Sequence, residues 1–233
     1  ANTPLLILGG KTGSGKTRLL VSFANSLDLE ALARHRGSAF GPRVAAQPGQ
    51  IDFENQLAIA LLKLQQNPLP RVLLEDESRA IGSLSLPLQL HNRMRASPLA
   101  VIEEPVNYRA GIILNDYIRI NFLEFRQTSP TDHHELFASY LTGSLGKIRK
   151  RLGGQLYSRI EQDMQDAISA HRQTDNLHVH QRWIETLLQT YYDPMYEYQL
   201  GKKLDHIIFR GNSEEFLAWA GHFNPLRAVN RSL

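Results

Sequence analysis

A glycine-rich octapeptide near the start of the chain is the segment whose residue types specify chemistry most directly. It reads Gly10-Lys11-Thr12-Gly13-Ser14-Gly15-Lys16-Thr17, which fits the pattern G-x-x-x-x-G-K-[ST] at every fixed position. In such a loop the backbone N–H groups turn inward toward an anion, and the positive end of the following helix points to the same place. We therefore predict that these eight residues bind a di- or triphosphate; the motif does not specify the reaction.

The last two residues of this motif have roles of their own in the prediction. Lys16 brings mobile positive charge to the terminal phosphates and is a candidate catalytic residue. Thr17 offers a hydroxyl group to Mg²⁺, a cofactor that prefers oxygen ligands and bridges phosphates.

Acidic residues follow a short buried strand pattern at residues 71–75 and provide candidates for acid–base chemistry. Glu75, Asp76 and Glu77 stand at its carboxyl end, where parallel sheets place ligands. Alternation along an extended chain puts Glu75 and Glu77 on one side and Asp76 on the other. Asp76 or Glu75 is the candidate metal ligand or general base, and Asp28 is a competing substrate-side acid. The alternative for any one of them is a solvated loop charge.

Basic residues form three groups that suit phosphate or nucleic acid. Arg34 and Arg36 follow Asp28, and Arg79 follows the acidic triplet; Arg36 and Arg79 are candidates to neutralise phosphate charge, although a wet surface loop explains them equally well. A third group of four charges could follow a nucleic-acid backbone, close as a lid over a triphosphate, or form a solvated face. Its members are Lys147, Arg149, Lys150 and Arg151.

Aromatic and histidine residues gather in the second half of the chain. Residues 191–198 contain four tyrosines, which could stack on unpaired bases, but we favour a helix end that fills the join between helices and sheet. The histidines at 133–134, 178 and 180 lack the spacing of a helical metal site. We interpret them as surface residues.

The elements around these residues alternate between strands and helices up to about residue 128. Short apolar runs at residues 5–8, 71–75 and 99–102 indicate buried strands, separated by helical patterns at 16–26, 52–65, 86–94 and 107–125. The residues from Asp28 to about Gln50 are expected to form a polar loop rich in Gly and Arg. Three further helices are indicated at 131–145, 155–172 and 178–192, followed by a last strand at 205–209. Asn212 and Glu215 resemble a capping box for a final helix.

This order predicts an α/β fold with a P-loop NTPase-like parallel sheet flanked by helices. Residues 1–128 form the P-loop α/β domain in this interpretation, and residues 129–203 form a helical subdomain inserted before the last strand. Residues 204–233 return to the α/β domain. No apolar run is long enough to span a bilayer, so we expect no membrane association and a cytoplasmic protein.

Composition excludes several kinds of site. The 233 residues include no cysteine, which rules out disulfides, thiolate metal sites and a cysteine nucleophile in this chain. The 26 Lys and Arg exceed the 23 Asp and Glu by a formal net charge of +3, a mild basic bias that permits nucleic acid or phosphorylated ligands.

Three segments together resemble one family. Residues 28–41, 74–82 and 191–196 are similar to the corresponding motifs of bacterial tRNA 2-selenouridine synthases, and the resemblance extends over essentially the whole chain. It implies an enzyme that acts on the wobble 2-thiouridine of tRNA and replaces sulfur with selenium from selenophosphate. It also implies transfer of a geranyl group from geranyl diphosphate to that sulfur, as an intermediate step.

The resemblance implies partners as well. The family's rhodanese-like domain, with its essential cysteine, is expected in the intact enzyme; the start at Ala1 and the missing cysteine suggest that this chain is the phosphate-loop part. Selenium transfer would then need the other domain, whereas geranyl diphosphate or a nucleotide would bind here. The expected tRNA-binding residues are Arg34, Lys147, Arg149, Lys150 and Arg151. The alternatives are a small-molecule kinase and a non-catalytic module that binds phosphate or tRNA.

Overall fold

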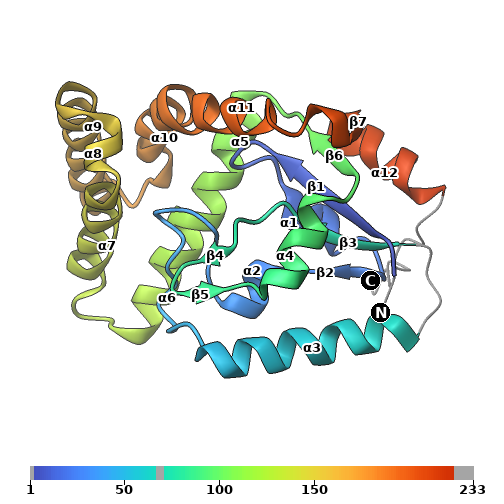
Figure 1. Cartoon of the computed structure of the whole chain (residues 1–233). Coiled ribbons are helices and arrows are strands. Elements are labelled where there is room, and N and C mark those ends of the chain that lie inside the picture. Colours follow the sequence, from blue (N-terminus) through green and yellow to red (C-terminus); the bar gives the residue numbers. More distant parts are fainter. Residues whose placement is uncertain (1–2, 67–70, 223–233) are drawn as a thin grey trace, which may run out of the picture.

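The computed structural model describes residues 3–66 and 71–222, and its centre is a five-stranded sheet (Figure 1). All neighbouring strands pair in parallel, in the order β2-β3-β1-β6-β7. The fold is therefore the predicted P-loop NTPase-like α/β fold. The strands are β1 (Leu5–Gly10), β2 (Ser26–Leu27), β3 (Val72–Glu75), β6 (Leu99–Ile102) and β7 (Ile207–Gly211).

The central strand β1 is buried along its whole length, and its alternating side chains feed two cores. Leu6 and Leu8 pack on one face with α1 (Lys16–Leu20) and α12 (Ser213–Gly221). Leu5 and Ile7 pack on the other face, which is covered by α2 (Leu29–Ala33), α3 (Gln50–Gln66) and α4 (Leu88–Arg95). A small hairpin of β4 (Ala80–Ile81) and β5 (Leu84–Ser85) lies beside this second layer.

A third core belongs to the helices that lie at one end of the sheet in Figure 1. Phe137, Ile160, Met164 and Trp183 are among its buried members, and Phe40 joins them from the first part of the chain. The α-helices of this part are α5 (Val106–Ile113), α6 (Ile120–Thr128), α7 (His133–Lys147), α8 (Arg149–Leu152), α9 (Gly154–Thr174), α10 (Gln181–Leu187) and α11 (Asp193–Leu200). The tighter or wider turns are η1 (Leu114–Arg119), η2 (Leu177–His180), η3 (Leu188–Tyr192) and η4 (Leu204–His206).

Three local expectations were wrong. The helix after the phosphate loop ends at Leu20 and not near Ser26, because the Ser26 hydroxyl donates to the Leu20 carbonyl oxygen at 2.6 Å and the chain then enters β2. The stretch expected as a polar loop contains α2, which Asp28 caps. The last strand begins at Ile207, because residues 204–206 form a short turn of helix.

The expectation for the start of the last helix was confirmed. The capping box at the start of α12 is present, since Asn212 accepts from the Glu215 N–H and the Glu215 side chain accepts from the Asn212 N–H. No helix among residues 3–66 and 71–222 is long and apolar enough to cross a membrane.

Helix α3 supplies a test of this packing. Phe53 is fully buried against the sheet, whereas Ile51 on the same helix is 75% exposed. We predict that Phe53→Ala lowers the free energy of unfolding by about 3–5 kcal/mol, because it leaves a cavity in the core. The matched change Ile51→Ala should stay within about 0.5 kcal/mol of the wild type. Urea denaturation measures both; similar losses in the two variants would contradict this packing.

Candidate functional site

The phosphate loop connects the end of β1 with the start of α1. Gly13 and Gly15 have φ angles of 81° and 79°, which non-glycine residues rarely adopt. A Cβ atom on Gly13 would also lie 2.7 Å from the Arg109 carbonyl oxygen. The Lys16 ammonium group donates to the Gly10 carbonyl oxygen at 2.9 Å, so the loop folds around its own lysine.

A cavity opens in front of this loop, and we call it the phosphate cavity. It has cationic and anionic walls, and its empty space is about 1020 Å³ with the open mouth included. The phosphate-loop residues from Thr12 to Thr17 line it. Its other charged residues are Arg18, Asp28, Glu30, Arg36, Arg43, Glu75, Glu77 and Asp116. The site therefore joins the glycine-rich loop to a group of carboxyl groups.

Glu75 is the carboxyl group held closest to the loop. Parallel pairing places it opposite Leu8 of β1, and the Thr17 hydroxyl donates to its Oε1 at 2.7 Å. Its side chain is buried, and Oε2 has no hydrogen-bond partner. Burial, with the neighbouring Glu77 and Asp28 charges, raises the pKa of Glu75 to about 8.

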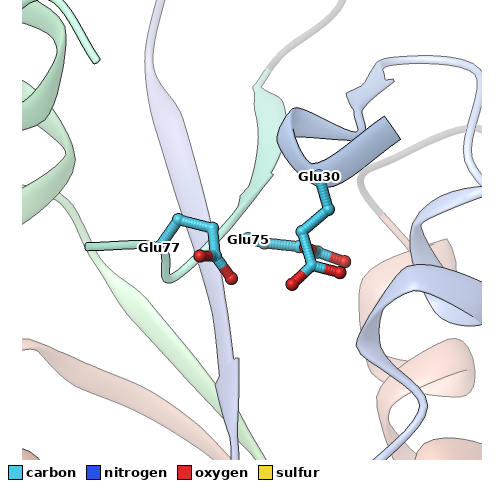
Figure 2. A group of neighbouring side chains, drawn as sticks. All are labelled: Glu30, Glu75 and Glu77. Atoms are coloured by element: carbon cyan, nitrogen blue, oxygen red, sulfur yellow. The ribbon is translucent and has the colours of Figure 1, made fainter. Parts of the chain in front are cut away.

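Two further glutamates meet Glu75 in the cavity. Figure 2 shows the carboxyl groups of Glu30, Glu75 and Glu77 turned toward one another from α2, from β3 and from the loop after it. One oxygen of each lies within 4.8 Å of the others. Burial and the two neighbouring carboxylates raise the pKa of Glu30 well above its usual value.

This donor set fits Mg²⁺. The ion takes carboxylate and hydroxyl oxygens beside phosphate, and it would satisfy the orphaned Oε2 of Glu75. Thr17 and Glu75 are the residues that would hold it, with Glu30 and Glu77 nearby. Sequence reasoning did not select Glu30; the signal was Asp28, a typical helix N-cap, two residues before it.

The other two acidic candidates occupy different surroundings. Asp28 lines the phosphate cavity while its side chain accepts from the Ala31 N–H at 2.7 Å, capping α2. Burial raises the pKa of Asp28. Asp76 faces away from the cavity, as alternation from Glu75 requires, and binds the Lys203 ammonium group at 2.6 Å.

Of the predicted phosphate-binding side chains Arg36, Arg79 and Lys11, only Arg36 lines the phosphate cavity. Arg36 lines the phosphate cavity; it is buried, donates to Asn121 at 3.3 Å and stacks its guanidinium group over Tyr117. Arg79 lines a second hollow with Asp76, on the other side of the loop. Lys11 turns away and donates to Glu197 at 2.6 Å.

The predicted tRNA-binding residues lie outside the phosphate cavity. Arg34 is exposed at the end of α2, and Lys147 lines a shallow hollow beside His35. Arg149, Lys150 and Arg151 form most of α8, at the far end of the helical part in Figure 1. Arg149 stacks over the Tyr157 ring, and Arg151 donates to the Tyr191 hydroxyl group at 3.4 Å.

The tyrosine-rich segment joins the helices to the sheet. Tyr192 is buried in the helical core, and Tyr196 packs against the core on the sheet face covered by α2, α3 and α4. Between them, Asp193 accepts two hydrogen bonds from Arg109, at 2.8 and 2.7 Å. Sequence reasoning missed Arg109, because it is an isolated basic residue in an apolar helix.

One histidine differs from the surface interpretation. His180 is completely buried and accepts from the Trp183 indole N–H at 3.0 Å. Its burial lowers the pKa of His180 to about 3, so it is neutral at physiological pH.

The buried Glu75 predicts how stability depends on pH. The folded pKa is about 8 and the usual value is 4.5, so the folded chain holds the proton more tightly. The protonated Glu75 therefore adds its full contribution to the free energy of unfolding below about pH 4.5. This contribution is lost as the pH rises to about 8. Glu75→Gln removes the titration, and it should gain stability relative to the wild type between pH 5 and pH 8, by at least about 1 kcal/mol.

Urea denaturation at both pH values measures this gain. The matched change at the exposed Glu54, Glu54→Gln, should follow the wild-type pH profile. A Glu75→Gln profile parallel to that of the wild type would contradict the buried, protonated carboxyl group.

Comparisons with known proteins agree with the motifs. A family model described as the tRNA 2-selenouridine synthase AAA domain matches residues 3–225. The tRNA 2-selenouridine synthase of Marinobacter nauticus is 45% identical over 215 residues, which cover 92% of this chain and 59% of the relative. That of Shewanella loihica is 42% identical over 221 residues, covering 94% and 59%.

A third relative, from Serratia proteamaculans, is 44% identical over 216 residues, covering 92% of this chain and 58% of the relative. No solved structure matches the chain. The chain thus spans 58–59% of the length of these curated relatives. With a family model over nearly all of its residues, the chain belongs to the tRNA 2-selenouridine synthase family.

Proposed function

We propose that this chain is the part of a tRNA-modifying transferase that binds geranyl diphosphate and directs S-geranylation of wobble 2-thiouridine. The observation that carries the proposal is the phosphate cavity, where the loop residues from Thr12 to Thr17 face the carboxyl groups of Glu30, Glu75 and Glu77. Membership of the tRNA 2-selenouridine synthase family supports tRNA as the acceptor.

The reaction exchanges one bond for another. The sulfur of 2-thiouridine forms a bond to C1 of the geranyl group, and the C1–O bond breaks with its electron pair leaving on diphosphate. The base loses its N3 proton, so the S-geranyl product is neutral. Because negative charge develops on the leaving oxygen, positive groups held beside it lower the barrier.

The residues of the cavity supply these groups. Lys16 and Arg36 neutralise the departing diphosphate, while the loop's backbone N–H groups hold it. Mg²⁺, when bound by Thr17 and Glu75, would add Lewis-acid stabilisation of the same leaving group. Asp28 suits the role of base for the N3 proton, because burial raises its pKa toward the working pH.

The tRNA would meet basic residues outside the cavity. Arg149, Lys150 and Arg151 form an exposed turn with Arg34 and Lys147 as further contacts, and such residues bind phosphates without reading sequence. A wobble base lies in a single-stranded loop, so it can be turned out of the stack to reach the cavity.

Selenium delivery belongs to the remainder of the intact enzyme in this proposal. This chain has no cysteine, and its relatives are longer. A rhodanese-like domain with a reactive cysteine would handle the step from selenophosphate, and the phosphate loop would handle diphosphate.

The phosphate loop predicts the effect of one substitution on ligand binding. Lys16→Ala should weaken the binding of geranyl diphosphate by at least about tenfold, because a charge-assisted contact to phosphate is lost. The matched change Lys63→Ala, at an exposed lysine of α3, should leave binding unchanged. Calorimetric titration measures both.

Product formation distinguishes the alternatives. Thiolated tRNA and geranyl diphosphate, followed by nucleoside mass spectrometry, should give S-geranyl-2-thiouridine with the wild type and none with Lys16→Ala. Unchanged binding in Lys16→Ala would sink the proposal. ATP turnover without tRNA would support a small-molecule kinase instead, and binding without product would support a non-catalytic module.

The basic turn predicts a second, independent result. Reversing two charges, Arg149→Glu with Arg151→Glu, should weaken tRNA binding by more than about tenfold at physiological salt and flatten its salt dependence. A control with the same charge change, Lys63→Glu with Arg126→Glu, uses exposed residues of α3 and α6. Equal tRNA affinities of the two double variants, measured by filter binding over a salt series, would count against this surface.

A further inference from the structure

A groove whose exposed surface is apolar opens beside the phosphate cavity, and we call it the apolar groove. Its walls come from the loop after α2, from the α5–η1 junction and from α10 and η3. No polar surface is exposed inside it. The residues that line it are Thr12, Ser38, Phe40, Ile113, Tyr117, Trp183, Ile184, Leu187, Leu188 and Tyr192.

The apolar groove and the phosphate cavity share a boundary. Thr12, Ser38 and Tyr117 line both spaces. A ligand whose diphosphate lies in the loop from Gly13 to Thr17 can therefore extend its other end into the groove. The two spaces together match an amphiphilic molecule, charged at one end and apolar at the other.

The chemistry of the lining selects the kind of apolar end. The hydroxyl groups of the lining residues do not contribute to the exposed surface of the groove. A nucleobase carries several donors and acceptors along its edge, and most of these would lose their hydrogen bonds to water on such a surface. A hydrocarbon chain has no such groups, and its transfer out of water is favourable. The groove thus favours a hydrocarbon diphosphate over a nucleotide.

The one indole N–H on the lining is already satisfied. Trp183 donates it to the buried His180 at 3.0 Å, and the Trp183 ring stacks on Phe40 with centroids 5.7 Å apart. His180 is neutral because burial lowers its pKa to about 3, so it can accept this bond. The pair keeps the polar atom of Trp183 out of the groove and leaves its ring as wall.

The shape of the groove suits a chain of limited width. The groove is tight, with about 340 Å³ between its lining atoms when the open mouth is included. An entering chain must therefore part the lining. Two of the walls, η1 and η3, are π-helical turns, which often occur at functional sites.

We propose that the apolar groove holds the hydrocarbon chain of a prenyl diphosphate whose phosphates occupy the phosphate loop, and that its lining sets the chain length accepted. This inference rests on the proposed function and adds the place where the chain binds. Ile184 and Leu188 line the groove without lining the phosphate cavity, so they can change chain binding apart from diphosphate binding.

The test compares four ligands by calorimetric titration: inorganic diphosphate, geranyl diphosphate, the longer farnesyl diphosphate, and ADP. The wild type should bind geranyl diphosphate at least about tenfold more tightly than inorganic diphosphate, because the chain is buried, and more tightly than ADP. Ile184→Phe, which narrows the groove, should remove at least about tenfold of this preference while changing inorganic diphosphate binding less than twofold.

Two further variants distinguish an effect on the groove from a general loss of structure. Ile184→Ala should raise the affinity for farnesyl relative to geranyl diphosphate by at least about fivefold, since the removed methyl groups leave room. Ile168→Ala, in the same helical core but outside the groove, should keep the wild-type ligand order. Binding of inorganic diphosphate reports that each variant is folded.

The outcomes separate the two proposals. If the wild type binds neither diphosphate, or prefers ADP, the proposed function fails. If the wild type prefers geranyl diphosphate but both Ile184 variants keep the relative affinities of the wild type for the four ligands, the proposed function stands and the groove inference is overturned.

Discussion

The buried ion pair between Arg109 and Asp193 is the interaction that connects the sheet, the phosphate loop and the helical core. The Arg109 guanidinium group binds both Asp193 oxygens, and the same group donates to the backbone carbonyl oxygens of Thr12 at 3.2 Å and Glu104 at 3.1 Å. Only 3% of the Arg109 side chain is exposed, so an unpaired charge there would be costly. One side chain thus ties the backbone of the loop at Thr12 to α11 at Asp193, a residue 84 positions after Arg109 in the sequence.

The site concentrates charge at the expense of stability. Glu30, Glu75 and Glu77 share a small volume, and burial disfavours their ionised forms. Ionising these three carboxyl groups together is unfavourable until a cation or a bound ligand balances their negative charge. Groups with shifted pKa values of this kind are common at functional sites. The hydrophobic cores on both faces of the sheet and among the helices support this charged centre.

Local features of the sequence were sufficient for part of this description. The phosphate loop, its flanking strand and helix, and the common side of Glu75 and Glu77 follow from motif and alternation over a few residues. Glu30 was missed because α2 is only five residues long and lies within a polar stretch. The apolar groove was beyond prediction, since Phe40, Tyr117 and Trp183 come together only in the folded chain. His180 is followed by the polar Gln181 and Arg182 in sequence, yet aromatic rings from α7 and α10 enclose it.

Thr12 has a consequence for how this family can diversify. Its backbone is held by Arg109, while the residue borders the phosphate cavity, the apolar groove and the second hollow that contains Asp76 and Arg79. It stands at one of the four unrestricted positions of the loop motif, so exchanging it leaves every glycine, Lys16 and Thr17 in place. A substitution at this single position can therefore change the shape of three neighbouring spaces at once while the glycines, Lys16 and Thr17 of the loop stay the same. Ligand preference can thus vary within the family without loss of the loop motif.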